Sequence, residues 1–382
     1  KNSIVTKINL KALFNRVLKF NYYLARKLML YPLSSNSWDK DEAAVFQRVL
    51  EKGRFTMGDS VKEFETDFAK KFKVSNALMV SSGSMANLIA LAAFFYKKKR
   101  PLRRGDEVIV PSISWATTYY PLQQFGLKLK FLDVELDTLN IDASKLEEAL
   151  TSKTRMVVAV NILGNPCALD TLRAFCDKYE LYLFEDNCES MGAEFKDKKT
   201  GTIGVMGTFS SFYSHHISTM EGGTIVTNDE ELHQILISLR SHGWTRDLPV
   251  KNLICDDKSE DLLEESFRFV LPGYNVRPLE LEGALGVEQV KKLPMIISER
   301  RKNAKLFTEI LSNHPDLIIQ KEIGKSSWFG LKKSYKLVTE EVEVSRDVDL
   351  NWALSANYIP VVYGVDRVAG KPVFVDTKSD DT

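Results

Sequence analysis

Residues 210–228 read SSFYSHHISTMEGGTIVTN, and this stretch decides how the fold of the chain is assigned. Two adjacent histidines, His215 and His216, precede the acidic-Gly-Gly sequence at residues 221–223. An imidazole can take up and release a proton near neutral pH, so a histidine here is a candidate acid–base residue. The alternative is a histidine with a purely structural role.

The overall composition is that of a globular protein. The chain has 382 residues, of which 44% are apolar, and its formal net charge is +1. This length accommodates one large domain and a smaller one. A near-neutral charge balance provides no concentrated basic face, which argues against binding to nucleic acid. The four cysteines contain no CxxC pair, and a chain of this size needs no disulfides, so we expect a reducing compartment, the cytoplasm.

Apolar, β-branched runs alternate with helical segments from residue 34 onward. The expected strands and helices lie at residues 77–80, 84–96, 108–110, 144–150, 156–160, 171–178 and 181–184. This alternation predicts an α/β fold with a mostly parallel central sheet. The pattern fades near Pro294, so we expect a large domain at 34–293 and a smaller C-terminal α+β domain at 294–382.

The first 33 residues differ from the rest in composition. Lysines and arginines occur there without an acidic residue, and apolar residues recur at helical spacing. Charges interrupt every apolar run well before the roughly 20 residues that a membrane span needs. We expect a basic amphipathic helix at 1–33, which packs on the protein, lies on a membrane surface or serves as a targeting segment.

Three further stretches carry candidate binding residues. VSSGSMAN (80–87) runs from a strand through a Ser/Gly turn into a helix, which is either a phosphate site or an ordinary connection. Trp115 follows the strand at 108–110, where its indole could stack on a planar ring or belong to the core. Asp186 ends another apolar run, where its carboxylate could keep a pyridine nitrogen protonated or cap a helix.

Together these stretches resemble the nucleotide-sugar aminotransferase family of pyridoxal phosphate enzymes, the DegT/DnrJ/EryC1/StrS family. The matching segments, in order between Tyr31 and Gly330, are WDKDE, RFTMG, SSGSMAN, SWATTYYPLQQ, NILGNP, EDNCESMGA, FSSFYSHH, HGWTRDLP, ESFRFVLPGYNVRP and SSWFG. The resemblance implies the aspartate aminotransferase-like fold of type I PLP-dependent transferases. That family places its Schiff-base lysine six residues before an acidic-Gly-Gly turn, and His215 stands at that position.

The resemblance also implies how the cofactor phosphate is bound. Gly83, Ser84 and Ser210 match the residues that hold the phosphate. Asn275 matches a residue that reaches the phosphate from the neighbouring subunit. A homodimer with shared active sites is therefore implied.

Four more positions acquire roles from the same resemblance. Trp115 is expected to stack on the cofactor ring, Asp186 to pair with the ring nitrogen, and Glu189 to lie near the ring hydroxyl. Arg246 is expected to bind the sugar diphosphate, although an exposed arginine could equally be an ion-pair partner.

Within this family, the branch with histidine in place of the lysine consists of sugar 3-dehydratases. An imidazole cannot form the Schiff base but can shuttle protons, so the cofactor is expected to be held without a covalent bond and to work as pyridoxamine phosphate (PMP). The implied reaction removes the C3 hydroxyl of a GDP-4-keto-6-deoxy-D-mannose-like substrate and gives a 3,6-dideoxy-4-keto sugar and ammonia. L-Glutamate is the implied amino donor, His215 is the expected catalytic residue, and His216 has no assigned role. The implied pathway is that of bacterial surface polysaccharides such as the lipopolysaccharide O-antigen.

Two departures from related sequences matter. Some sugar 3-dehydratases hold an iron–sulfur cluster through several cysteines, whereas the corresponding interval here has only Cys255, so no cluster is expected. After Gly330 the resemblance weakens, and Ile359 stands where an arginine is expected before Pro360. Two alternatives therefore stand beside the dehydratase: a PLP-dependent nucleotide-sugar aminotransferase, which the missing lysine disfavours, and a non-catalytic cofactor-binding scaffold or sensor.

Overall fold

The computed structural model describes residues 36–312, 317–327, 331–333, 366–368 and 371–373. The helix expected at 1–33 and most of the region after residue 327 lie outside these ranges. Within them, no helix combines the length and the apolar character needed to cross a membrane.

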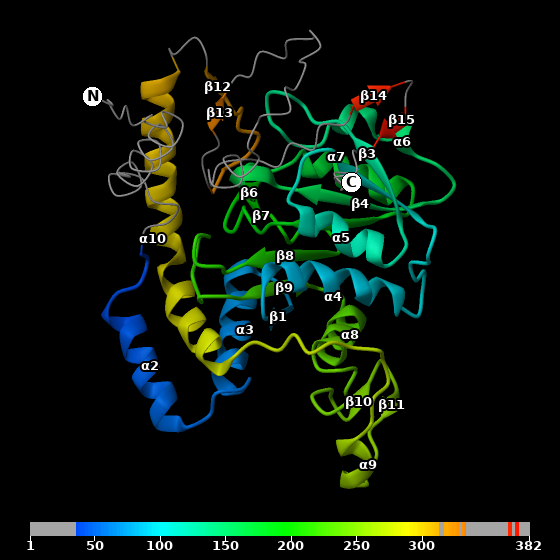
Figure 1. The fold of residues 1–382 in the computed structure, drawn as a ribbon, viewed down its shortest axis with the longest axis vertical. Coiled ribbons are helices and arrows are strands. Elements are labelled where there is room, and N and C mark those ends of the chain that lie inside the picture. The colour runs from blue at the N-terminus through cyan, green and yellow to red at the C-terminus, as the bar shows by residue number, and fades with distance from the viewer. Residues whose placement is uncertain (1–35, 313–316, 328–330, 334–365, 369–370, 374–382) are drawn as a thin grey trace, which may run out of the picture. The chain divides into compact units, whose positions relative to one another are not determined.

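A seven-stranded sheet forms the centre of the described structure (Figure 1). Its strands lie side by side in the order β1 (Asn76–Val80), β9 (Gly223–Thr227), β8 (Met206–Ser210), β5 (Tyr182–Asp186), β4 (Thr154–Val160), β2 (Glu107–Pro111) and β3 (Lys128–Leu132). Strand β9 pairs antiparallel with both of its neighbours, and all other pairs are parallel. The expected α/β fold with a mostly parallel sheet is confirmed.

Strand β4 shows why these strands read as apolar runs. Met156 and Val158 pack in the same hydrophobic cluster as residues of α4 (Gly83–Phe95) and α8 (Glu230–Arg240). Val157 and Ala159 point to the opposite face and pack with residues of α7 (Leu169–Lys178). Because side chains alternate along a strand and both faces are covered, all residues of β4 except Arg155 are buried.

Helices α3 (Asp59–Phe72) and α10 (Glu280–Leu311) pack against each other beside β1. The rings of Phe68 and Phe72 stack with centroids 4.4 Å apart and also contact the ring of Phe209 of β8. The two helices approach closely, because a Cβ on Gly283 would lie 2.7 Å from Val61. Helix α10 continues through Pro294, the predicted start of the small domain, and that boundary stays a prediction.

The remaining elements lie outside the central sheet. They are α2 (Lys40–Lys52), α5 (Ala116–Gln124), α6 (Leu146–Ala149), α9 (Leu262–Ser266), β6 (Glu194–Phe195), β7 (Lys198–Lys199), β10 (Lys251–Asn252), β11 (Asp256–Asp257), β12 (Leu317–Ile319), β13 (Leu331–Lys333), β14 (Asp366–Val368) and β15 (Lys371–Val373). Residues 241–279, which include β10, β11 and α9, form a segment that we call the arm. Figure 1 shows β10, β11 and α9 extending away from the sheet beyond α8.

Candidate active site

Most of the predicted site residues follow the ends of parallel strands at one edge of the sheet. Ser84 comes shortly after β1, Trp115 after β2, Asp186 at the end of β5, and Ser210 at the end of β8. In open α/β sheets this carboxyl edge is where ligands bind. The strand topology therefore gathers residues that lie more than a hundred positions apart in the sequence.

Glycines at the start of β9 bring two of these turns together. Gly223 pairs with Val80 at the end of β1 and with Ser210 at the end of β8. A Cβ on Gly223 would overlap the carbonyl group of Ser82, so only glycine permits this approach. The acidic-Gly-Gly sequence thus has a structural reason: it lets the turn before α4 and the turn after β8 lie against each other.

The turn before α4 has the donors of a phosphate site. Ser82 caps the helix, and its Oγ accepts a hydrogen bond from the N–H of Met85 at 3.2 Å. The N–H groups of Gly83 and Ser84, in the first turn, have no intrahelical acceptor. A Cβ on Gly83 would lie 2.7 Å from Cβ of Ser210, so the two residues are in direct contact. These donors and the positive end of the helix dipole fit a phosphate.

Asp186 is buried and firmly held. Its Oδ2 accepts hydrogen bonds from Nδ2 of Asn87 at 2.9 Å and from Oγ1 of Thr118 at 2.8 Å, and its Oδ1 accepts one from the N–H of Cys188 at 3.1 Å. A turn follows Asp186 rather than a helix, so the helix-capping alternative has no support. A carboxylate fixed by three donors is suited to hold a protonated ring nitrogen.

Glu189 lies close enough to Asp186 for the two carboxyl groups to influence each other. Burial raises the pKa of Glu189, and the charge of Asp186 raises it further. The N–H of Leu163 donates to Oε2 of Glu189 at 2.8 Å, which acts in the opposite direction. Leu163 has a φ of 52°, a left-handed backbone conformation that this hydrogen bond helps to maintain.

Trp115 stands immediately before α5, and its side chain is 59% exposed. A core role is therefore wrong for this tryptophan. Its neighbour Ser114 exchanges a hydrogen bond with Thr118, which in turn donates to Asp186. An exposed indole that adjoins the hydrogen-bond network of Asp186 is available to stack on a planar ligand.

His215 is held by its main chain rather than by its ring. The N–H of His215 donates to the carbonyl of Phe212 at 2.9 Å, and the carbonyl of His215 accepts a hydrogen bond from Nη2 of Arg300 at 3.1 Å. Nδ1 of His215 is buried and has no hydrogen-bond partner among the described residues. Burial, followed by the positive charge of Arg300, lowers the pKa of His215 to about 4, and Asp186 acts in the opposite direction. The imidazole is therefore neutral at pH 7 and can accept a proton.

Asn275 and Arg246 are not part of this edge. Both line a cavity of about 990 Å³ that none of the other predicted site residues lines. Oδ1 of Asn275 accepts a hydrogen bond from Nε of Arg277 at 3.1 Å, and the guanidinium of Arg246 lies 4.1 Å from the ring centre of Trp244. Asn275 is nevertheless next to Val276, whose carbonyl accepts a hydrogen bond at 3.0 Å from the N–H of Ser81, just before the turn that carries Gly83 and Ser84.

Several residues that the sequence interpretation missed support the site. Asn87, Thr118 and Leu163 belong to the quoted SSGSMAN, SWATTYYPLQQ and NILGNP stretches and could have been considered there, whereas Arg300 lies outside every quoted stretch. Arg300 lies 85 positions from the histidine that it contacts. Arg54 and Arg277 add positive charge to the cavity that Arg246 lines.

Comparison with known proteins identifies a family and several relatives. Residues 36–361 match the model of the DegT/DnrJ/EryC1/StrS aminotransferase family. The chain is 54% identical over 322 residues to the GDP-4-keto-6-deoxy-D-mannose 3-dehydratase of Yersinia pseudotuberculosis, an alignment that covers 83% of this chain and 82% of that protein.

Two solved structures of a GDP-4-keto-6-deoxymannose-3-dehydratase are similar in fold and sequence. One is a histidine-to-asparagine mutant with bound GDP-perosamine, with a TM-score of 0.78 and 56% identity over 80% of each chain. The other contains a trapped PLP-glutamate geminal diamine, with a TM-score of 0.78 and 56% identity over 80% of this chain and 81% of that one.

Proposed function

Because the chain belongs to the DegT/DnrJ/EryC1/StrS aminotransferase family, we propose that it is a PMP-dependent nucleotide-sugar 3-dehydratase acting on GDP-4-keto-6-deoxy-D-mannose. The observation that carries this function is the imidazole of His215 at the position where the family has its lysine, on the same sheet edge as Asp186. The aspartate aminotransferase-like fold that the sequence implied is confirmed by the solved relatives.

The reaction balances with L-glutamate as reductant. The GDP-linked 4-keto-6-deoxy sugar loses its C3 hydroxyl and gains a hydrogen in its place, and glutamate supplies the two electrons. The products are the 3,6-dideoxy-4-keto sugar, 2-oxoglutarate and ammonia. When bound, PMP supplies an amine that condenses with a ketone and a ring that accepts an electron pair.

The residues of this chain then have separate tasks. Gly83, Ser84 and Ser210 bind the phosphate of the cofactor through N–H and hydroxyl donors. With the cofactor bound, Asp186 would keep a proton on the ring nitrogen, and this positive charge would help the ring to accept electrons.

The other three residues act on the faces and edges of the ring. With the cofactor bound, Trp115 would cover one face of the ring, and Glu189 would lie near the ring hydroxyl. His215 takes up a proton on its neutral imidazole and returns it, because no covalent bond occupies its side chain.

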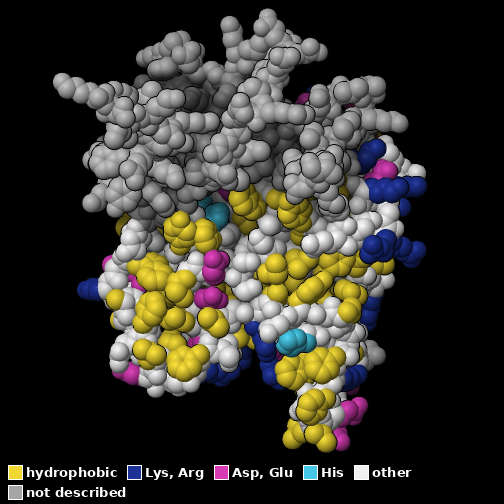
Figure 2. All heavy atoms as spheres, viewed as in Figure 1, with side chains coloured by type: hydrophobic (Ala, Val, Ile, Leu, Met, Phe, Trp, Pro, Cys, Tyr) yellow, Lys and Arg dark blue, Asp and Glu magenta, His cyan; other side chains and the backbone are white. Residues whose placement is uncertain are grey.

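Shared active sites in a homodimer are the second part of the proposal. Asn275 and Arg246 line a cavity that His215 does not line, as expected if they serve the partner's site. The arm also exposes apolar side chains, which gather at its end in Figure 2; those more than half exposed are Val250, Leu262, Leu263, Phe267 and Phe269. An exposed apolar surface of this kind marks a protein interface.

Cytoplasmic location is the third part. All four cysteines of the chain are free thiols, and Cys167 and Cys176 are buried. Free cysteines without disulfides suit a reducing compartment, where nucleotide sugars are made.

Product analysis tests the function. The wild-type protein, supplied with PMP, L-glutamate and GDP-4-keto-6-deoxy-D-mannose, is expected to release one ammonia for each sugar that loses its C3 hydroxyl. An aminated sugar without ammonia would identify an aminotransferase, and binding without turnover would identify a scaffold or sensor.

Mixing two inactive variants tests the shared site. His215→Asn and Asn275→Ala are each expected to be inactive as homodimers. A mixed dimer contains one site with both wild-type residues if they come from different chains, so activity should return to about a quarter of the wild-type value after statistical exchange. No recovery would place Asn275 and His215 in the same chain's site.

A further inference from the structure

The residues around the two histidines form a turn that the rest of the protein holds at several points. We call residues 214–218 the histidine turn. At its far end, the N–H of Ser218 donates to Oε1 of Gln289 at 3.0 Å, and Nε1 of Trp38 donates to the carbonyl of Ser218 at 2.9 Å. Both backbone polar groups of Ser218 are therefore fixed by side chains.

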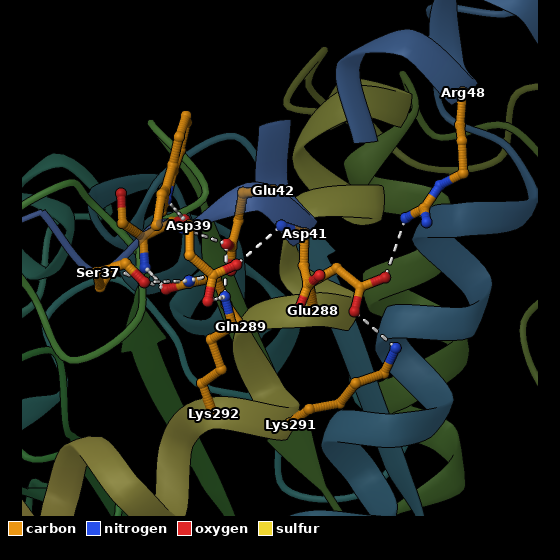
Figure 3. A network of polar contacts seen from close by, with 11 residues as sticks. Ser37, Asp39, Asp41, Glu42, Arg48, Glu288, Gln289, Lys291 and Lys292 are labelled. Carbon is orange, nitrogen blue, oxygen red and sulfur yellow. Dashed lines mark hydrogen bonds and ion pairs between the residues drawn. The ribbon is translucent and has the colours of Figure 1, made fainter. Parts of the chain in front are cut away.

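The side-chain amide of Gln289 makes hydrogen bonds with several residues besides Ser218. It is completely buried, and Figure 3 shows it between Ser37 and Glu42. Its Nε2 donates to Oε1 of Glu42 at 2.6 Å and to the carbonyl of Ser37 at 3.3 Å, and its Oε1 also accepts from Oγ of Ser37 at 3.1 Å. With Ser218, all four hydrogen-bonding positions of the amide are used. The WDKDE stretch at residues 38–42 thus supports the histidine turn.

Glu42 in turn forms an ion pair with Lys292. Its side chain is fully buried and pairs with Nζ of Lys292 at 2.6 Å. Nζ of Lys292 also lies 2.8 Å from Asp39 (Figure 3). The cation, Nε2 of Gln289 and the N–H of Asp39 together satisfy this buried carboxylate.

Arg300 reaches the near end of the same turn from the same helix. It lies 11 residues after Gln289, which is three helical turns or about 16 Å along α10. Its Nη2 donates to the carbonyl of His215 at 3.1 Å. Gln289 and Arg300 therefore hold the two ends of the histidine turn from one face of one helix.

His216 makes a further attachment. Its Nε2 lies 3.1 Å from the carbonyl of Ser327, and since a carbonyl only accepts, Nε2 carries the hydrogen. Burial, with the charge of Arg300, lowers the pKa of His216 well below its ordinary value. A buried imidazole that is hydrogen-bonded to the main chain through Nε2 supports the turn.

We propose that Arg300 is a positioning residue for His215: from α10 it fixes the main chain of the base and keeps a permanent positive charge near the imidazole. This inference rests on the proposed function for its kinetic effect, because the base must be used in turnover. Its structural part concerns His215 alone and can be measured without turnover.

The charges that act on His215 come from three elements. Arg300 on α10 lowers its pKa, Asp186 at the end of β5 raises it, and His216 in the same turn is neutral. Burial has the largest effect and lowers the pKa. Removal of the Arg300 charge should therefore raise the pKa of His215 toward its ordinary value near 6.5.

Two substitutions separate the charge from the hydrogen bond. Arg300→Gln removes the charge but keeps an N–H donor, and Arg300→Lys keeps the charge but loses the planar guanidinium. Lys302→Gln is the matched control, because Lys302 is an exposed cation on the same helix that pairs with Glu299. Circular dichroism and the affinity for PMP establish that each variant is folded and binds the cofactor.

The two variants are expected to differ in the pH dependence of kcat. Arg300→Gln should move the acidic limb of the kcat profile to higher pH and lower kcat on the order of 10- to 100-fold, the cost of a displaced catalytic group. Arg300→Lys should lower kcat while the acidic limb stays in place, and Lys302→Gln should change neither. Unchanged kcat and an unchanged acidic limb in Arg300→Gln would overturn the proposal.

A titration of His215 by NMR distinguishes failure of this inference from failure of the function. Histidine-labelled, cofactor-free protein has five histidines, and His215→Asn assigns the signal. A higher pKa of His215 in Arg300→Gln than in wild type and Arg300→Lys is expected even if the wild type releases no ammonia. Equal values in all three proteins would contradict the inference whatever the protein catalyses.

Discussion

Asp186 and His215 belong to neighbouring parallel strands and the turns that follow them, yet the protein holds them in opposite ways. The carboxylate of Asp186 accepts three hydrogen bonds, from Asn87, Thr118 and the N–H of Cys188. The protein instead holds His215 through its main chain, and Nδ1 of its ring has no partner among the described residues. The first arrangement fixes a charge in place, and the second leaves a base free to exchange a proton.

Replacing the imidazole of His215 by a lysine amine should have the largest effect on activity. His215→Lys puts a lysine at the position where the family has its Schiff-base residue, so the variant should trap pyridoxal phosphate covalently and lose dehydration entirely. Mass spectrometry after borohydride reduction should find the cofactor on residue 215 in the variant and no modification there in wild type. A cofactor reduced onto another lysine of the wild-type pocket would mean that His215 does not replace the anchoring residue.

Removal of the fixed charge should have the next largest effect. Asp186→Asn is expected to leave a folded protein whose kcat is lower by a factor on the order of 10²–10³, because the ring nitrogen loses its charged partner. Steady-state ammonia release measures the change. Asp177→Asn, at an exposed aspartate of α7, is the control and should keep full activity. Near-normal turnover by Asp186→Asn would leave this carboxylate with only a structural role.

Loss of one of the three donors should have a smaller effect. Thr118→Val removes the hydroxyl that donates to Oδ2 of Asp186 at 2.8 Å, while Asn87 and the N–H of Cys188 remain. A hydrogen bond to a charged group contributes enough that kcat should fall roughly tenfold. Thr171→Val, at an exposed position of α7, controls for the substitution itself. A loss as large as that of Asp186→Asn would show that Thr118 does more than hold the carboxylate.

The lowered pKa of His215 should also affect how the stability of the folded protein depends on pH. The folded protein holds His215 neutral down to a pKa of about 4, whereas the unfolded chain takes up its proton near pH 6.5. The unfolded state therefore binds the extra proton between these values, and the free energy of unfolding falls as the pH is lowered from 6.5 to 4. Denaturation of cofactor-free wild type and His215→Asn at several pH values should show a smaller decrease for the variant. Parallel curves would mean that the pKa of His215 is not lowered.

The sheet could be predicted from the sequence because its signals are local. The apolar runs at 77–80, 108–110 and 156–160 correspond to β1, β2 and β4 within two residues at each end. A strand that is buried on both faces is an uninterrupted run of apolar residues. Such a run can be recognised in the sequence without information from other segments. The resemblance of short motifs then identified the family, which the comparisons confirm.

The support of the site could not be predicted, because it depends on contacts between distant segments. Gln289 and Arg300 lie in an ordinary helical sequence, and only the packing of α10 beside the histidine turn gives them their roles. Trp38 was visible as part of a matching motif, but its bond to Ser218 spans 180 positions. That Asn275 lines a cavity that His215 does not line likewise follows from the fold and not from any local pattern.

The most direct measurement is ammonia release by His215→Asn compared with wild type under identical conditions, with binding of PMP and of the GDP-linked sugar measured on the same samples. If His215 carries the proton, the variant should bind both ligands and release ammonia more slowly by a factor on the order of 10²–10⁴. Undiminished ammonia release by the variant would contradict the central role of His215 and assign proton transfer to another group.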